Sequence, residues 1–477
     1  MSTPLAFLGF SLVVVLLFHA SPSAVWRRGV LLAANLCFLA SFFSGFLAYV
    51  PFAVFLLACY AGLMLIRRAP RFAFLPVLLG TLAAFVWLKH YAFVPTRLFL
   101  PFAYFTDGLS YILFRVLHLM IDTRTGAMRE RIGFLSYVNY ILNFTTFTLG
   151  PIQLYPDYLK MNAAAMESRL SSPVVATALE RITKGLFKTN ILALLFSAMQ
   201  TRSIDALGAQ QPPGMRVLCA ALALVLYAFF IYCNFSGFID IVIGVGSLIG
   251  FTLPENFNRP FAVDNFLDFW TNRWHITLSA WIRTYVYNPL LVALLRRFYS
   301  RMLEPVWAVF AFFVTFFLVG VWHGQTTEFL VYGLLLGLGV SGNKMYQLVM
   351  TAQMGRKRFS KLAANPVYSA IARGLTFTYF TTALILFWSN WRQIHELEST
   401  LGWSLVAGVC VAIFAGSTVL LALWEWLRGM VVATSFDEAP MLAQCGRLAW
   451  SVALVVIILV VTLLMNQAAP DLVYKAF

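Results

Sequence analysis

The chain has 477 residues, of which 61% are hydrophobic and only 11% are charged. Soluble domains usually carry about 45–50% apolar and about 25% charged residues, so the charges here are too few to cover soluble domains of this total size. The 34 basic and 19 acidic residues leave a net charge of +15. Composition excludes a soluble enzyme, a disordered protein and a secreted disulfide scaffold, and it predicts an all-α polytopic membrane protein.

A transmembrane helix needs about 20 mostly apolar residues. Candidate spans run approximately over Pro4 to Ala20, Val30 to Ala48, Pro51 to Ile66, Phe72 to Leu88, Phe99 to Ile121, Gly133 to Pro151, Val174 to Met199, Val217 to Phe235, Trp307 to Trp322, Phe329 to Leu348, Ala372 to Trp388, Leu401 to Leu427 and Leu448 to Met465. Ile239 to Leu253 and Leu278 to Leu295 are short or bounded by Gly and Pro, which favours re-entrant segments. We expect about 11 to 14 membrane elements.

Short basic clusters separate several of these runs, which is typical of the cytoplasmic ends of membrane helices. They are Arg27–Arg28, Arg67–Arg68–Arg71, Arg296–Arg297–Arg301 and Arg356–Lys357–Arg358–Lys361. No basic, aromatic groove accompanies them, so we expect no nucleic-acid partner. The pattern predicts a multi-pass protein of the cytoplasmic (inner) membrane whose lipid bilayer is its first partner. A basic inner face could also help to recruit an anionic acyl donor.

The least apolar long stretch runs from Leu253 to Tyr287 and mixes prolines, charges and aromatic residues. Such backbone is tolerated at membrane depth only where protein or water surrounds it, so this stretch is the expected lining of a cavity. We expect irregular backbone from Pro254 to Pro260, with Glu255 and Asn256 bonding backbone groups that the prolines free.

Two of the six histidines are candidates for chemistry. His323 lies between two uncharged apolar runs, where an imidazole must face protein or water, and Gly324 leaves room beside it. Neutral imidazole is also the commonest general base near neutral pH. His275, next to Trp274, is a plausible partner, although an interfacial position explains it equally well. For His118 a satisfied structural role is the default.

Other chemistries find little support. The six cysteines form no CxxC pair, and no HExxH motif, phosphate-binding loop or GxSxG elbow occurs, so we expect neither a metal nor a tightly bound cofactor. Ser279 follows His275 by one helical turn, and a hydroxyl bonded to its own helix is the commoner reading of such a serine.

Four motifs that occur together over residues 232–324 are typical of one protein family. They are YCNFSGFID over 232–240, FTLPENFNRP over 251–260, FWTNRWHITLS over 269–279 and VWHG over 321–324. Together with GLSY over 108–111 and LGPI over 149–152, they resemble the membrane-bound O-acyltransferase (MBOAT) superfamily. The similarity covers about Gly108 to Asn343 and is greatest to the bacterial branch of alginate O-acetylases and teichoic-acid D-alanyl transfer proteins.

The resemblance implies a ring of tilted helices around a central funnel or tunnel, with His323 near its midpoint. It also implies N-terminal transmembrane helices over 1–105, a catalytic core over 106–350 and C-terminal transmembrane helices over 351–477. His323 would be the general base and His275 would position or polarise a reacting group. The residues expected to line or brace the cavity are Asn258, Arg273, Trp274, Ser279, Arg283 and Trp322.

The expected reaction moves an acyl group from a cytosolic thioester, acyl-CoA or acyl-carrier protein, to a hydroxyl of an exported envelope polymer or of an extracytoplasmic partner protein. Asn234 stands where the family usually has Asp, Gln153 follows Gly-Pro-Ile, and Tyr332, Gly333 and Asn343 are closer to the D-alanyl branch. Acetyl and D-alanyl therefore both stay open. The alternatives are a transporter or flippase with proton-relay histidines and a catalytically silent scaffold.

Overall fold

The computed structural model describes residues 4–42, 45–208, 210–298, 300, 302–433, 446, 449–458 and 460, and within them it contains helices and one isolated β-bridge but no strand. The α-helices are α1 (Pro4–His19), α2 (Ala24–Ala40), α3 (Phe46–Arg68), α4 (Pro70–Leu88), α5 (Leu109–Thr125), α6 (Phe134–Ile141), α7 (Tyr155–Glu167), α8 (Ser172–Phe187), α9 (Ala193–Asp205), α10 (Pro213–Ile249), α11 (Phe266–Asp268), α12 (Ile276–Ile282), α13 (Asn288–Arg297), α14 (Glu304–Trp322), α15 (Thr327–Met354), α16 (Arg356–Ala363), α17 (Pro366–Ala383), α18 (Ile385–Trp388), α19 (Trp391–Leu401) and α20 (Trp403–Ala433). The 3-10 helices are η1 (Thr96–Leu98), η2 (Phe144–Thr146) and η4 (Pro260–Ala262). The π-helices are η3 (Lys188–Leu192), η5 (Phe269–Arg273) and η6 (Arg283–Tyr287).

Six helices in the described part of the chain are long and apolar enough to cross a membrane. They are α3, α4, α10, α14, the combined segment Pro366–Trp388 and the first 28 residues of α20. The predicted all-α, polytopic fold class is therefore confirmed. The ring and central funnel stay predictions. The predicted last span, Leu448 to Met465, falls largely outside the described residues.

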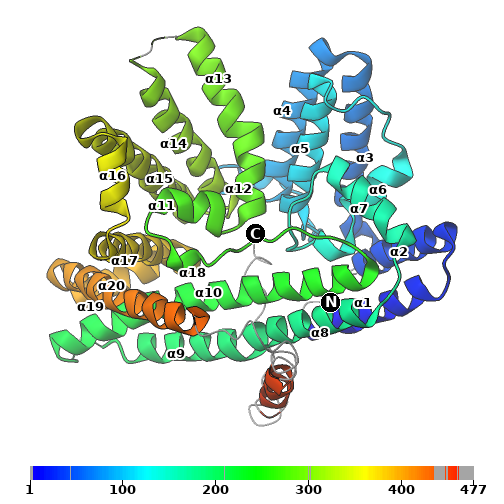
Figure 1. The fold of residues 1–477 in the computed structure, drawn as a ribbon. Helices are drawn as coiled ribbons and strands as arrows, with labels where there is room; N and C mark the ends of the chain where they lie inside the picture. The colour runs from blue at the N-terminus through cyan, green and yellow to red at the C-terminus, as the bar shows by residue number, and fades with distance from the viewer. Residues whose placement is uncertain are drawn as a thin grey trace.

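The longest helix, α10, corrects the sequence prediction of two separate elements at Val217 to Phe235 and Ile239 to Leu253. Its 37 residues form one continuous helix, which packs against α8, α9 and α20. The polar run inside it does not break the helix because Asp240 is paired with Lys188 at 2.7 Å and Arg181 at 3.1 Å. Figure 1 shows α10 running across the lower half of the molecule beside α8 and α9.

Two groups of helices rise from this base in Figure 1: α3, α4 and α5 on one side, and α13 and α14 on the other, with α12 between them. The segment Leu278 to Leu295, expected to be re-entrant, forms α12, η6 and α13, which follow one another without a break. A helix whose hydrogen bonds widen locally to the π pattern keeps its backbone satisfied, so no irregular loop is needed there.

The pair α14 and α15 meets at two glycines. A Cβ atom on Gly320 would lie 2.1 Å from the Cα atom of Gly333, so the two backbones touch. Such contacts between small residues are typical of packed membrane helices. This close crossing determines the position of the chain just beyond Trp322, where α14 ends at His323.

The basic clusters do not all behave as exposed anchors. Arg27 is buried, and its guanidinium donates to the carbonyl oxygens of Ala165 at 3.1 Å, Met166 at 2.8 Å and Ser168 at 3.0 Å. It thereby satisfies carbonyl groups at the C-terminal end of α7, which have no partner within the helix. Arg301, the last member of another cluster, lies outside the described residues.

Candidate active site

His323 directly follows Trp322, the last residue of α14, and is the C-cap of that helix. Only 1% of its surface is exposed. Its Nδ1 atom lies 2.6 Å from the backbone oxygen of Val319, one helical turn earlier. A carbonyl oxygen only accepts hydrogen bonds, so Nδ1 carries the proton of the neutral ring and Nε2 is the basic nitrogen. The helix itself therefore selects the tautomer that a general base requires.

Aromatic rings surround this imidazole on several sides. The ring centroids of Trp322, Phe387 and Tyr332 lie 4.9, 5.3 and 5.9 Å from that of His323. Tyr332 comes from α15 and Phe387 from α18, so three helices enclose the residue. The enclosure excludes bulk water from the imidazole.

His275 is held in a different way. It precedes α12 in the left-handed conformation, with φ 49° and ψ 53°, which costs an L-residue roughly 1–2 kcal/mol. The residues around it compensate: Asn258 N donates to Arg273 O at 3.0 Å and Ile276 N donates to Asn256 O at 3.0 Å. These bonds flank the isolated antiparallel bridge between residues 257 and 274. The irregular Leu253–Tyr287 stretch thus fixes this histidine.

The ring of His275 is also buried, with 1% of its surface exposed. Its Nε2 atom lies 3.5 Å from the hydroxyl of Tyr111 on α5, and its centroid lies 5.0 Å from that of Phe235 on α10. Tyr111 links the two histidines, because its ring centroid lies 6.4 Å from that of His275 and 6.2 Å from that of Trp322, the residue before His323. The structure therefore brings the two predicted histidines together from distant parts of the sequence.

Asn256 is the main support of this arrangement, although it was not among the residues expected to line or brace the cavity. It is fully buried, and its Oδ1 atom accepts hydrogen bonds from Thr277 N at 3.1 Å and Thr277 Oγ1 at 2.9 Å. Thr277 Oγ1 is in turn the acceptor for the backbone N–H of Ile152 at 3.0 Å. Asn256 does bond a backbone group, but this is the N–H of Thr277 in the first turn of α12 and not a group freed by the flanking prolines. Glu255 instead binds Arg181 with both carboxylate oxygens.

The predicted lining residues divide into two groups. Trp274 and Trp322 are buried, and Trp322 lies against the imidazole of His323. Asn258 is exposed, and the side chain of Arg273 pairs with Asp268 at 3.0 Å. These last two residues brace the loop rather than the imidazoles.

Ser279 and Arg283 line a separate cavity of about 190 Å³ between α12, η6 and α14. The hydroxyl of Ser279 donates to the backbone oxygen of Trp270 rather than to the preceding turn of α12. The expected bond from this hydroxyl to its own helix is therefore wrong, and the oxygen of His275, the N-cap of α12, instead accepts from the backbone N–H of Ser279 at 3.1 Å. The same geometry removes Ser279 from the position of a partner for His275 on one helix face.

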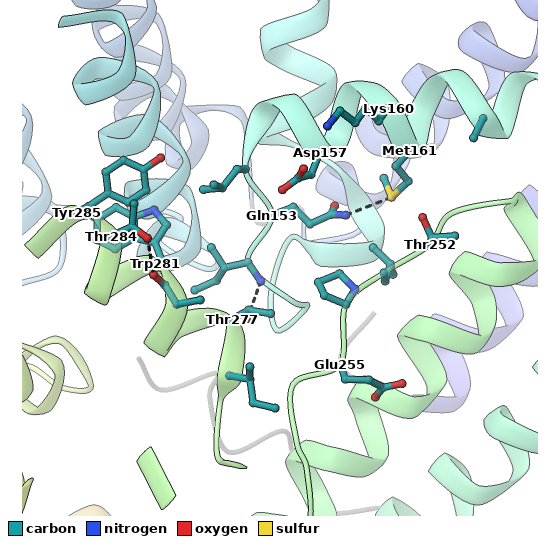
Figure 2. Close-up of a pocket in the computed structure, with 17 residues that line it drawn as sticks. Gln153, Asp157, Lys160, Met161, Thr252, Glu255, Thr277, Trp281, Thr284 and Tyr285 are labelled. Atoms are coloured by element: carbon teal, nitrogen blue, oxygen red, sulfur yellow. Dashed lines mark hydrogen bonds between the residues drawn. The ribbon is translucent and has the colours of Figure 1, made fainter. Parts of the chain in front are cut away.

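A larger groove of about 700 Å³ is lined by residues of α7, of α12 and of the segment around Pro254, and neither His275 nor His323 is among its lining residues. Figure 2 shows Asp157 and Lys160 of α7 facing Thr284 and Tyr285 across this groove, with Thr277 and Glu255 farther along it. Ile276 and Thr277, which directly follow His275, form part of its wall. Val321 and Gly324, which flank Trp322 and His323 in the chain, line a small void of about 10 Å³.

A second buried histidine network borders the groove. The backbone N–H of Tyr155 donates to Nε2 of His118 at 2.9 Å, so Nδ1 of His118 carries the proton of the neutral ring. Nδ1 lies 2.9 Å from the carboxylate of Asp122 and 2.8 Å from the hydroxyl of Tyr285. The Tyr285 hydroxyl also donates to Asp122 at 3.0 Å. The default reading of His118 as a satisfied structural residue is confirmed, and the network joins α5, α7 and η6.

Among the residues that the structure describes, no group of three or more His, Cys, Asp and Glu side chains gathers closely enough to hold an ion. The groups that the site offers are the two buried imidazoles and the hydroxyl of Tyr111, which lies 3.5 Å from Nε2 of His275.

Comparison with known proteins matches this arrangement to one family. The sequence model of the membrane-bound O-acyltransferase family matches residues 72–384. The chain is 25% identical over 280 residues to a teichoic acid D-alanyltransferase of Bacillus subtilis, covering 59% of this chain and 68% of that protein. It is 28% identical over 286 residues to a peptidoglycan O-acetyltransferase of Helicobacter pylori, covering 55% and 50%.

A third relative is a probable alginate O-acetylase of Pseudomonas aeruginosa, which is 27% identical over 247 residues. That alignment covers 52% of this chain and 43% of the relative. The matched residues contain both histidines, Asn256 and the groove of Figure 2.

Proposed function

Because the chain belongs to the membrane-bound O-acyltransferase family, we propose that it transfers an acetyl or D-alanyl group from a cytosolic thioester to a hydroxyl of an exported envelope polymer or of a partner protein. The observation that carries this proposal is the buried imidazole pair, in which Nε2 of His323 is the basic nitrogen. Members of this family generally need no tightly bound cofactor. In our proposal the thioester, acyl-CoA or acyl-carrier protein, is a co-substrate.

In the proposed reaction, Nε2 of His323 accepts the proton of the acceptor hydroxyl as that oxygen attacks the thioester carbonyl. The carbon–oxygen bond forms, and the tetrahedral oxyanion then collapses with breakage of the carbon–sulfur bond. The imidazolium of His323 returns its proton to the departing thiolate, so the residue ends as it began. His275, held beside it, positions or polarises the reacting carbonyl.

The groove of Figure 2 is the proposed approach for the donor. Ile276 and Thr277, next to His275, form part of its wall, and its charges are mixed because Asp157 and Glu255 oppose Lys160. Such a lining suits an extended, largely uncharged thioester arm better than a polyphosphate, which requires clustered cations. The charged part of acyl-CoA, or the carrier protein, would then remain outside the groove.

The acceptor proposal rests on the relatives, whose names refer to teichoic acid, peptidoglycan and alginate. All three are polymers of the cell envelope, so an exported polymer, or an extracytoplasmic acyltransferase that passes the group onward, is the proposed acceptor. Mass spectrometry of envelope polymers from cells with and without the protein distinguishes acetyl from D-alanyl, since the two groups differ in mass.

The decisive variant is His323→Ala. We expect acyl incorporation, normalised to folded protein in the membrane, to fall by at least about 100-fold, the low end for the loss of a general base. His395→Ala is the matched control, because this exposed histidine lies on α19 near Glu398. Near-wild-type transfer by folded His323→Ala protein would contradict the mechanism. In proteoliposomes, acceptor or ion movement without consumption of the thioester would instead indicate a transporter.

A further inference from the structure

A second large cavity contains neither His275 nor His323 among its lining residues. It has a volume of about 870 Å³ and is formed where the first turn of α14, the second half of α15 and α16 meet. Leu348, Val349 and Phe359 provide apolar wall, and Lys344 and Arg356 provide two cations. Lys344 and Leu348 are four residues apart, so one face of α15 presents both to the cavity.

The shape of this cavity is built into the backbone. Gly355 has φ +81°, a conformation that L-residues rarely adopt, and it ends α15 so that α16 turns back toward it. The ring of Phe359 on α16 packs edge-on against Tyr346 of α15, with 6.1 Å between centroids. The hydroxyl of Tyr346 lies 2.9 Å from that of Tyr368 on α17, which ties a third helix to this corner.

The charged residues of α16 are all basic. The eight residues of α16 include Arg356, Lys357, Arg358 and Lys361 and contain no acidic residue. Within the described residues, none of these four side chains, nor Lys344, takes part in an ion pair. The positive potential is therefore not neutralised by the protein and is available to an anionic ligand.

The cavity also lies at a membrane boundary. Pro305, which lines it, belongs to the first turn of α14, and α14 is one of the helices able to cross a membrane. The wall residue Val349 is 42% exposed, which is unfavourable in water but favourable beside lipid chains. The cations thus lie at the level where lipid phosphates lie, and the apolar wall extends beside them.

We propose that this cavity binds an anionic glycerophospholipid of the bilayer, with its phosphate between Lys344 and Arg356 and the start of an acyl chain along Leu348, Val349 and Phe359. A small anion would use the cations but not the apolar wall. An acidic protein would meet the exposed cations of α16 but has no reason to fill a cavity that opens at the membrane boundary. The lipid uses both features.

The helix α15 extends from this cavity to the active site, where it carries Tyr332 against His323. A lipid that fills the corner between α14, α15 and α16 binds the folded protein and not the unfolded chain, so it should raise the unfolding temperature. It acts at the opposite end of α15 from the imidazole, so the acyl-transfer step itself does not require it.

The test uses the full-length protein in detergent with added phosphatidylglycerol or phosphatidylcholine, and counts retained lipids by native mass spectrometry. We expect retention of phosphatidylglycerol by the wild type to exceed that by Lys344→Gln/Arg356→Gln by about tenfold or more, since each cation near a lipid phosphate contributes to binding. The control variant Arg202→Gln/Arg392→Gln removes two exposed charges elsewhere and should retain the lipid like the wild type.

Unchanged total acyl transfer by Lys344→Gln/Arg356→Gln shows that this variant is folded. It also separates the lipid proposal from the proposed function. Three results would overturn the lipid site: equal retention by both double variants, equal retention of phosphatidylcholine and phosphatidylglycerol, or equal thermal stabilisation by inorganic phosphate. Loss of binding to an acidic carrier protein, with lipid retention unchanged, would make α16 a protein-docking surface and would also overturn it.

Discussion

The two histidines of the site are held by opposite means. His323 ends a regular helix, and its side chain bonds the backbone one turn earlier in the same helix. His275 lies in a strained left-handed conformation between η5 and α12, and its neighbours are bonded to Asn256, which belongs to a separate loop. One residue depends on local geometry and the other on long-range contacts.

This difference suggests a division of labour. A base must present one nitrogen in a defined protonation state, and a helix supplies that at little cost because the carbonyl four residues earlier is already in place. A positioning residue must fit a substrate that bridges several elements, so it is carried by backbone that those elements hold jointly. Backbone strain of this kind persists only where the surrounding structure compensates for it.

The largest effect should come from the helix crossing that positions His323. In Gly320→Ala, the new Cβ would meet the backbone of Gly333 at 2.1 Å, so α14 and α15 must separate. We expect the free energy of unfolding to fall by up to about 3 kcal/mol, measured by denaturation in detergent. Gly342→Ala on the same α15 has open space at its Cβ and should cause no loss. Equal behaviour of the two variants would show that the crossing does not determine this region.

The loop that holds His275 should respond next. Asn256→Ala removes the acceptor for two hydrogen bonds from Thr277 in a buried site, which should cost about 2 kcal/mol of stability. Transfer activity should fall with it, because the backbone of His275 loses its support. Asn258→Ala is the matched control, since this exposed residue bonds Arg273 through its backbone only. A larger loss for Asn258→Ala would reverse the roles assigned to the two asparagines.

Backbone strain at His275 predicts a smaller and more specific effect. His275→Gly and His275→Ala remove the same imidazole, but only glycine adopts φ 49° without steric cost. The free energy of unfolding should therefore be about 1 kcal/mol higher for His275→Gly than for His275→Ala, and the glycine variant should unfold at a higher denaturant concentration. Both variants should lose transfer activity to a similar extent, and less than His323→Ala if the role of His275 is positional. Equal stability of the alanine and glycine variants would show that the backbone at position 275 is not strained.

The smallest disturbance is expected from cysteines placed in the basic clusters. Arg68→Cys and Arg358→Cys replace exposed residues and should change stability by less than about 0.5 kcal/mol. With the exposed Cys37 and Cys410 changed to serine, both new thiols should react with an impermeant label only from the cytoplasmic side. Labelling from opposite sides would break the topology on which the donor approach to the two histidines depends.

Much of this molecule follows from sequence alone, because the relevant physics is local or compositional. Too few charges for a water-exposed surface determined the membrane setting, and two prolines in seven residues determined the irregular segment from Pro254 to Pro260. The burial of His323 between two uncharged runs identified the candidate base, and helical geometry then selects its basic nitrogen. The four quoted motifs identified the family without any coordinates.

The tertiary structure alone decided which residues support the site. Asn256 and Asn258 are chemically identical and lie two residues apart, so only the position of Thr277 shows which one is buried and bonded. Tyr111 reaches His275 across 164 residues of sequence, and Asp240 stays inside a continuous α10 because Lys188 and Arg181 arrive from neighbouring segments. A single sequence records each residue's chemistry but not its partner, and the partner determines whether a polar group in the membrane breaks a helix, braces a loop or holds a catalytic ring.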